Sequence, residues 1–268
     1  MKLVEYLKEL RKRGERTFTV SDLVKRFQIS HDYARVALHR LLRSGDIISP
    51  ARGFYVIIPP EYQIQGSIPA KELMPLMMRH LGVSYYVALL SAGLFYGATH
   101  QKSAKFQVIS DKRIKRKLVF GDIAIEFIYK KNLLGLPTQN FTVSTGYLAV
   151  AAPELIALDL LNYPEHSGGL NHIATVFSEL IESLNADKLI SLAEQIKSEY
   201  QLQRIGYILD HIDFIDDTGA KEIIDRIADY IQKNKSKYLP LASELPQKNF
   251  PKCEKWRIVI NTEIESDL

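Results

Sequence analysis

The chain has 268 residues, of which 46% are hydrophobic and 25% charged, a composition typical of globular proteins with a sizeable core. It contains no run of about 18 apolar residues, which excludes a membrane-spanning helix, and its first residues lack the apolar stretch of a signal peptide. The single cysteine, Cys253, excludes an internal disulfide and a thiolate-rich metal site. We therefore expect a soluble cytoplasmic protein with no membrane partner.

Charge is distributed unevenly along the chain, although the net charge at pH 7 is only +4. The net charge is +6 over residues 1–60, +6 over residues 61–149, −10 over residues 150–229 and +2 over residues 230–268. Clustered positive charge attracts a polyanion, whereas an acidic segment repels one. The pattern predicts that the first half of the chain, and not the second, faces a polyanion.

The first residues carry the pattern of two short helices. Apolar residues recur at helical spacing from Leu3 to Lys12, and Gly14 ends this helix. Residues 17–19 form a short β-prone segment. Ser21 follows as the expected N-cap of a second helix.

A third helix is expected from about His31 to Ser44, with Ser30 as its N-cap. Its apolar residues repeat at positions i, i+3, i+4, i+7 and i+8, which fixes the side that is buried. These residues are Ala34, Ala37, Leu38, Leu41 and Leu42.

Two short strands follow at residues 46–49 and 54–58, joined by a turn with Arg52 at its tip. The order of elements is then helix, strand, helix, turn, helix, hairpin. This order predicts a winged helix-turn-helix domain over residues 1–60.

The polar side of the third helix predicts binding to double-stranded DNA. An α-helix fits the major groove, where residues near its N-terminal half reach base edges. We expect base-edge contacts from His31, Asp32, Tyr33, Arg35 and His39, with Ser30 in the same DNA-binding set. Arg40 and Arg43 are expected to bind phosphates, and Arg52 to enter a minor groove. Winged helices also serve as protein-binding modules, and this alternative stays open.

The rest of the chain mixes helix and strand patterns. Helices are expected at residues 69–80 and 84–97, and strands at 106–110, 117–120, 123–129, 141–144 and 147–150. From Pro153 to about Lys233 the pattern is mostly helical, with breaks at 168–169, 185–186 and 217–219. We therefore predict an α+β fold with a second domain over residues 61–268. That domain has a small sheet with helices in 61–150 and a mostly helical part in 151–268.

A basic segment lies between residues 102 and 117, and its residues form a possible auxiliary patch: Lys112, Arg113, Lys115, Arg116 and Lys117. Such a patch is typical of an auxiliary site for nucleic acid or a protein partner. A solvated loop beside a strand explains it equally well, and both interpretations stay open.

The sequence contains none of the glycine-rich phosphate-binding motifs and no pair of histidines at helical metal-binding spacing. Asp122 and Glu126 resemble a nuclease carboxylate pair, but the lysine expected two positions later is missing. A cation site is the less favoured alternative for the aspartates at 210, 213, 216 and 217, which are more simply solvated or capping a helix. We expect no enzyme activity, no cofactor and no metal.

Four segments, in order along the chain, resemble the AbiEi-type antitoxins of abortive-infection (type IV) toxin–antitoxin systems. The first is the wing strand Arg52-Gly53-Phe54-Tyr55-Val56. The others are residues 112–116 with 121–127, residues 143–145 with the helix start at 152–161, and the turn at 167–170. Leu155 departs from the family, which commonly has a basic residue at this place, so no role of that charge carries over.

The resemblance implies a DNA-binding antitoxin. Such proteins repress their own operon by binding inverted repeats in its promoter, and they counteract a co-encoded nucleotidyltransferase toxin. The type IV mode implies opposition without an obligatory stable complex, so direct contact with the toxin stays open.

Two other function classes remain open. One is a winged-helix transcription factor whose second domain senses a small ligand, and the other is an enzyme with a DNA-targeting domain.

Overall fold

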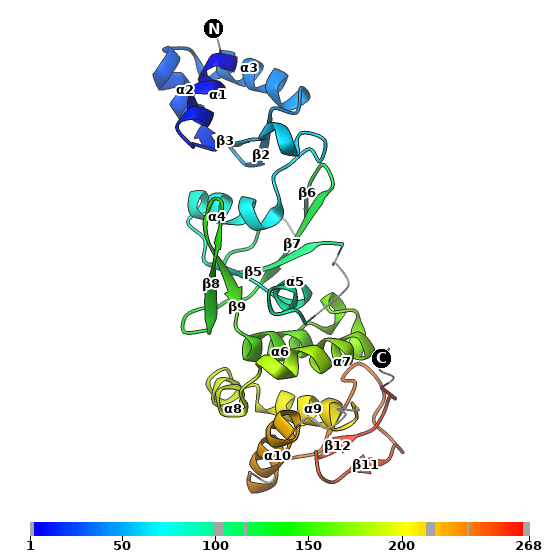
Figure 1. Ribbon diagram of the computed structural model, residues 1–268. Helices are drawn as coiled ribbons and strands as arrows, with labels where there is room; N and C mark the ends of the chain where they lie inside the picture. The colour runs from blue at the N-terminus through cyan, green and yellow to red at the C-terminus, as the bar shows by residue number, and fades with distance from the viewer. Residues whose placement is uncertain (1–2, 99–103, 115–116, 213–217, 235, 265–268) are drawn as a thin grey trace. The chain divides into compact units, whose positions relative to one another are not determined.

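The computed structural model describes residues 3–98, 104–114, 117–212, 218–234 and 236–264. The fold is α+β, as predicted (Figure 1). The chain forms two compact units. Unit 1 consists of Met1–Tyr85, Ala104–Leu133 and Asn140–Leu148, and unit 2 of Tyr86–Ser103, Leu134–Gln139 and Ala149–Leu268. No helix among the described residues is long and apolar enough to cross a membrane.

The amino-terminal part of unit 1 has the predicted order of elements. These are α1 (Leu3–Lys12), β1 (Thr17–Thr19), α2 (Val20–Phe27), α3 (His31–Arg43), β2 (Ile47–Ala51) and β3 (Phe54–Ile57). The strands form an antiparallel sheet in the order β1-β3-β2. The three helices gather with the β2–β3 hairpin in the blue part of the chain (Figure 1).

Apolar side chains from all three helices and the sheet form one core. Leu7, Leu23 and Leu38 are almost fully buried, one from each helix. Phe18 of β1 stacks on Tyr55 of β3, with ring centroids 5.5 Å apart. Because each helix has a single apolar stripe, burying those stripes together fixes which sides remain in water.

The expected N-cap of α2 at Ser21 is wrong, because the helix begins two residues earlier, at Val20 after the cap residue Thr19. The Thr19 hydroxyl accepts from Asp22 N at 3.2 Å, and Asp22 Oδ2 accepts from Thr19 N at 2.7 Å. This reciprocal capping box requires an acidic residue three positions after the cap. Asp22 stands there for Thr19, whereas Ser21 is followed at that spacing by Val24.

The second part of unit 1 contains η1 (Pro60–Tyr62), α4 (Ala70–Leu81) and three strands. These are β5 (Phe106–Ser110), β6 (Lys117–Phe120) and β7 (Ile123–Tyr129). The three predicted strands are confirmed, and β7 pairs in parallel with β5 and antiparallel with β6. α4 is joined to the amino-terminal part by an ion pair between Arg16 Nη1 and Glu72 Oε2, 2.9 Å apart. His80 of α4 also stacks on Phe54, with ring centroids 4.2 Å apart.

The helix expected over residues 84–97 is wrong. That segment contains β4 (Tyr85–Val87), the short α5 (Leu89–Gly93) and η2 (Leu94–Tyr96). β4 pairs in parallel with β9 (Gly146–Ala151), with Val87 opposite Val150, and β9 follows β8 (Thr138–Val143) as the predicted hairpin. A short buried strand and a buried helix give the same continuous apolar pattern, so periodicity alone does not separate them.

Unit 2 is mostly helical beyond residue 151. Its helices are α6 (Pro153–Asn162), η3 (Pro164–His166), α7 (Gly169–Leu180), η4 (Ile181–Ser183), α8 (Ala186–Gln195), α9 (Glu199–Asp210) and α10 (Thr218–Lys233). The breaks predicted at 168–169 and 185–186 are confirmed, and the one at 217–219 lies partly outside the described residues. An additional sheet, β10 (Leu239–Pro240), β11 (Lys252–Cys253) and β12 (Ile258–Val259), was not predicted. Its strands are too short to give a pattern.

α9 is the buried centre of unit 2, and the last part of the chain is fastened to it by polar side chains. Gln203 Nε2 donates to the carbonyl oxygens of Lys237, Trp256 and Arg257. The fully buried ring of Trp256 packs directly against Gly206.

Replacing Gly206 with alanine should therefore destabilise unit 2. The added Cβ would overlap the Trp256 ring, and we expect the free energy of unfolding to fall by about 3 kcal/mol, at the upper end for overpacking. Urea denaturation measures this change. Ser191→Ala, at an exposed position of α8, is the control and should leave stability within about 0.5 kcal/mol. Equal stabilities of the two variants would contradict the packing argument.

Candidate nucleic-acid interface

The connection between α2 and α3 is short and held by its own backbone and side chains. α2 ends at Phe27, and the cap residue Gln28 that follows adopts the left-handed conformation, with φ 53°. Ser30 is the N-cap of α3, as predicted, and its hydroxyl accepts from Tyr33 N at 3.2 Å. The two helices are thereby set at a fixed angle by a turn of only a few residues.

α3 has a buried side and an exposed side. Ala34, Leu38 and Leu41 are buried, as the apolar stripe predicts. Leu42, which was expected to be buried, is instead 38% exposed, since the contact with the core is narrower than the stripe. Every residue assigned to DNA contact on this helix is exposed: His31, Asp32, Tyr33, Arg35, His39, Arg40 and Arg43.

The exposed side of α3 is basic, although one acidic residue lies at its beginning. Arg35 Nη1 is 3.6 Å from Asp32 Oδ1, and both side chains are largely in water. An exposed pair of this kind contributes little to stability, so either partner is available for another ligand.

Arg52 occupies the tip of a tight hairpin. Ala51 is paired with Phe54, which leaves Arg52 and Gly53 as a two-residue loop, and Gly53 supplies the positive φ of 73° that the turn needs. Ser49 Oγ donates to the carbonyl oxygens of Ala51 and Phe54, each at 3.2 Å, which fixes the base of the loop. Arg52 is exposed.

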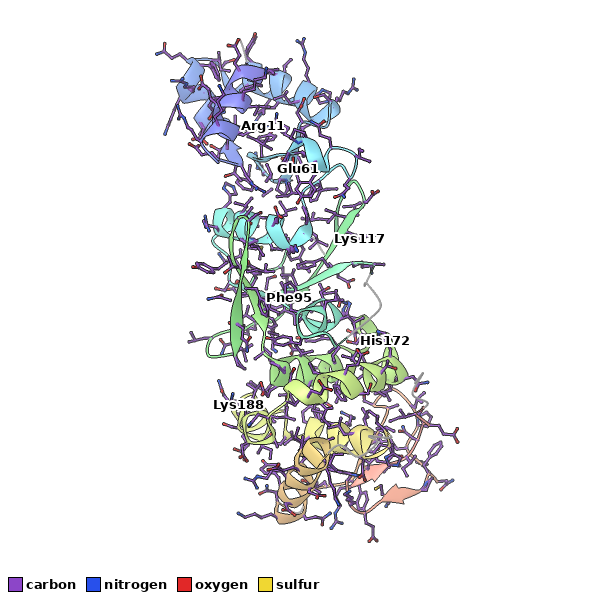
Figure 2. The ribbon with its side chains drawn as sticks, viewed as in Figure 1. Arg11, Glu61, Phe95, Lys117, His172 and Lys188 are labelled. Atoms are coloured by element: carbon purple, nitrogen blue, oxygen red, sulfur yellow. The ribbon has the colours of Figure 1, made fainter. Side chains whose placement is uncertain are left out.

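The residues of the predicted auxiliary patch lie elsewhere in unit 1, after β5. Lys112 Nζ donates to the carbonyl oxygen of Gly82 at 3.1 Å, and the Arg113 guanidinium lies 4.7 Å from the centre of the Tyr129 ring. Lys117, labelled in Figure 2, is the exposed first residue of β6. Lys115 and Arg116 lie outside the described residues.

The carboxylates considered for catalysis or metal binding have structural partners. Glu126 is buried, and its Oε1 is 3.3 Å from Lys105 Nζ, whereas Asp122 is exposed on the turn before β7. Burial raises the pKa of Asp210, but hydrogen bonds from Lys255 and Trp256 outweigh it and lower the pKa overall. In the described part of the chain, no three His, Cys, Asp or Glu side chains gather where an ion would be held. The aspartates at 213, 216 and 217 lie outside that part.

Unit 2 contains buried polar pairs that the sequence analysis missed. Tyr86 OH donates to Asp159 Oδ2 at 2.7 Å, and Glu154 Oε1 accepts from Asn185 N at 3.1 Å. Burial raises the pKa of Tyr86, and the Asp159 charge raises it further; burial also raises the pKa of Tyr163 to about 12. The only signal in the sequence was that Glu154 and Asp159 lie within an apolar helix pattern. A single sequence does not show whether such an acid is buried or exposed.

Removing the Tyr86 hydroxyl should destabilise unit 2. Tyr86→Phe leaves the fully buried Asp159 with one donor fewer, and we expect the free energy of unfolding at pH 8 to fall by about 1–3 kcal/mol. The same tyrosine makes wild-type stability fall as pH rises above about 10, because the unfolded chain ionises there and the folded chain does not.

Denaturation series at pH 8 and at pH values above 10 test both points. The variant should show a shallower alkaline loss than the wild type. Tyr147→Phe, at a 70% exposed position, is the matched control. An unchanged alkaline slope in Tyr86→Phe would refute the assignment.

Comparisons with known proteins find a family similar to the middle of the chain, in residues that belong to both units. Residues 86–211 match the family described as the AbiEi antitoxin C-terminal domain. The crystal structure of the RV2827C protein from Mycobacterium tuberculosis has a similar fold, with a TM-score of 0.65 and 17% sequence identity. That similarity covers 94% of this chain and 89% of the other, and at this identity it shows the fold alone. No curated protein matches the chain.

The matched segment runs from β4 through α9 and includes the helix start at Pro153-Glu154 and the glycine turn before α7. Both features had been identified in the sequence as segments that resemble the AbiEi antitoxins. Residues 86–211 are therefore similar to the C-terminal domain of the AbiEi antitoxins, which supports an antitoxin of this type.

Proposed function

We propose that this chain is a DNA-binding antitoxin that represses its own toxin–antitoxin operon and counteracts a co-encoded nucleotidyltransferase toxin. The antitoxin role follows from the AbiEi antitoxin C-terminal domain. The family resemblance implies the repressor role and the type of toxin. In this proposal the protein acts in the cytoplasm, as part of a type IV toxin–antitoxin system for phage defence. The chain acts without enzyme activity of its own in this proposal.

The proposed DNA-binding domain is a winged helix-turn-helix over residues 1–60, with residues 61–268 as the antitoxin part. The observation that carries this proposal is the exposed basic side of α3, which the buried stripe at Ala34, Leu38 and Leu41 forces into solvent. A helix presented in this way fits the major groove, and the Arg52 loop of the hairpin then lies beside it as the wing.

Within that interface we propose different roles for the arginines. Arg35 lies in the first half of α3, as does the exposed Tyr33, where side chains reach base edges. Arg40 and Arg43 lie in the last turns and bind phosphates, which adds affinity without discrimination. Two half-sites of an inverted repeat are then read by two copies of the chain.

A ligand-responsive transcription factor is the alternative, and a cavity in unit 2 favours it. The cavity has a volume of about 760 Å³ and is lined in part by Asn162, Tyr200, Arg204 and Glu244. A small molecule that raised the melting temperature of the protein and released it from DNA would establish this alternative.

The DNA proposal predicts the behaviour of a triple variant. Arg35→Ala/Arg40→Ala/Arg52→Ala should bind the DNA upstream of its own gene at least tenfold more weakly than the wild type. Because the variant loses the phosphate contact proposed for Arg40, the dependence of log affinity on log salt should become shallower by about 1. Gel-shift titrations at two salt concentrations measure both quantities.

The control variant removes the same charge from unit 2, at exposed lysines 188, 221 and 233. It should bind the upstream DNA as the wild type does. Among single variants, Arg35→Ala should reduce the preference for the operator over a scrambled duplex, whereas Arg40→Ala should weaken both equally. Retention of selective binding by the triple variant would rule out α3 as the reading helix.

The division of labour between the two parts predicts that the triple variant still neutralises the toxin. The full chain is the right material, because deleting residues 1–60 would leave the buried Glu72 without Arg16 and His80 without Phe54. The measurement is the growth of cells that express the toxin together with either the wild type or the triple variant, and both should restore growth. Loss of rescue by a folded triple variant would show that the DNA-binding residues also serve the antitoxin role.

A further inference from the structure

An open cavity of about 370 Å³ lies at the carboxyl end of α4, within unit 1. We call it the tyrosine cavity, because the rings of Tyr85 and Tyr147 line it together with the apolar side chains of Pro75, Met78 and Val83. The side chain of Tyr147 is 70% exposed, so its ring is open to a ligand. An exposed aromatic ring beside an apolar lining fits a flat, weakly polar group.

The rim of the tyrosine cavity is positively charged. Arg79 lines the cavity, is exposed, and has no ion-pair partner among the residues that the structure describes. Lys112 Nζ donates to the carbonyl oxygen of Gly82, another lining residue, and this bond places the ammonium group at the edge of the cavity. The acid next to Lys112 in the sequence is Asp111, and its Oδ1 accepts a hydrogen bond from Ser84 N at 3.1 Å.

The walls of the cavity are held in place by hydrogen bonds. Thr145 Oγ1 donates to the carbonyl oxygen of Glu72 at 2.7 Å, which fixes the turn before Tyr147 to α4. A side chain at Gly146 would come within 3.3 Å of Arg79 Nη2, so the guanidinium lies over that same turn. A preformed site of this kind loses little conformational entropy when a ligand binds.

A second aromatic ring with a cation lies along the same end of the strands. Tyr129, the last residue of β7, is 40% exposed and has Arg113 over its ring. It pairs with Ser110 of β5, and the next residue, Asp111, bonds to Ser84, just before Tyr85. Two strand spacings separate the backbones of Tyr129 and Tyr85, about 10 Å.

We propose that the tyrosine cavity binds an unpaired base of a single-stranded nucleic acid, and that Arg79, Lys112 and Arg113 bind the adjoining phosphates. Exposed aromatic rings spaced along a basic surface are the usual means of holding single strands, because every base has a face that stacks. In a duplex the faces of the bases are covered by their neighbours, so the cavity selects unpaired nucleotides. An apolar protein side chain would fill the lining but leave the cations of the rim without partners, whereas a nucleotide brings a flat ring and a phosphate together.

This site is separate from the proposed duplex-reading face of α3 and gives the basic segment after β5 a function. The test uses the full chain and fluorescein-labelled strands of about ten nucleotides, one RNA and one DNA of the same sequence. Tyr147→Ala should weaken binding about tenfold, as expected for the loss of one stacked base, and Tyr147→Phe should bind as the wild type does. Arg79→Gln should also weaken binding and make its salt dependence shallower by about 0.7 in log–log slope.

The controls separate this proposal from the preceding one. Tyr200→Ala removes a tyrosine that is 45% exposed in unit 2 and should bind single strands normally. Tyr147→Ala should leave binding to the upstream duplex unchanged, whereas the triple arginine variant should lose the duplex and keep the single strands. Tighter binding to RNA would identify RNA as the ligand, and equal binding would identify any single strand.

Equal affinity of wild type, Tyr147→Ala and Arg79→Gln for both strands would overturn the proposal, as would the absence of binding by the wild type. If the wild type bound neither strand while folded Tyr147→Ala lost toxin neutralisation, the cavity would belong to a protein partner instead.

Discussion

The buried carboxylate of Glu72 is the interaction on which the arrangement of unit 1 depends. It is 7% exposed, and a carboxylate so removed from water needs a cation close by. Arg16, just before β1, supplies that cation at 2.9 Å, and the backbone carbonyl of Glu72 accepts from Thr145. The charge of Glu72 also raises the pKa of Tyr62 in η1. One turn of α4 thus joins the amino-terminal helices to the turn that carries Tyr147.

This connection has a consequence for how unit 1 is divided. The proposed DNA-binding domain ends near residue 60, but its packing partners continue into α4, where His80 covers Phe54. Removing the first sixty residues would expose that ring partner and leave a buried charge unpaired, which is strongly destabilising. Point variants on the exposed side of α3 avoid this difficulty, because they touch no contact that holds α4.

Much of the amino-terminal fold was predictable because its signals are local. The stripe of α3, its cap at Ser30 and the glycine at the tip of the hairpin each act within a few residues. The cap of α2 was misplaced for a local reason as well, since Asp22 serves Thr19 and not Ser21. By contrast, the strand at Tyr85–Val87 exists because β9 pairs with it from about sixty residues away, and no pattern in the segment itself shows that partner.

The interface residues divide in the same way. The exposure of the polar residues on α3 could be predicted from the sequence, because the helix has one apolar side. The exposure of Arg52 could be predicted because it lies in a tight turn. The tyrosine cavity was not predictable, because it is formed where the end of α4, the start of β4 and the β8–β9 turn meet. Lys112 and Arg113 were visible in the sequence as part of a basic segment, but only the folded chain shows Lys112 bound to Gly82 of the cavity and Arg113 over the Tyr129 ring. Arg79, on α4, was not singled out in the sequence.

The two units differ in what they bury and in what they expose. In unit 1 the buried carboxylates Glu72 and Glu126 are each paired with a cation, which balances their negative charge. In unit 2 the buried Arg204 is instead held by the carbonyl oxygens of Pro240 and Leu241 and by Gln201. Its charge is therefore shielded from solvent, and unit 2 buries two acids of residues 150–229 as well, Glu154 and Asp159. The ion pairs leave the net charge of each segment unchanged, so the positive charge of residues 1–149 and the negative charge of residues 150–229 still favour the approach of a polyanion to the first half of the chain.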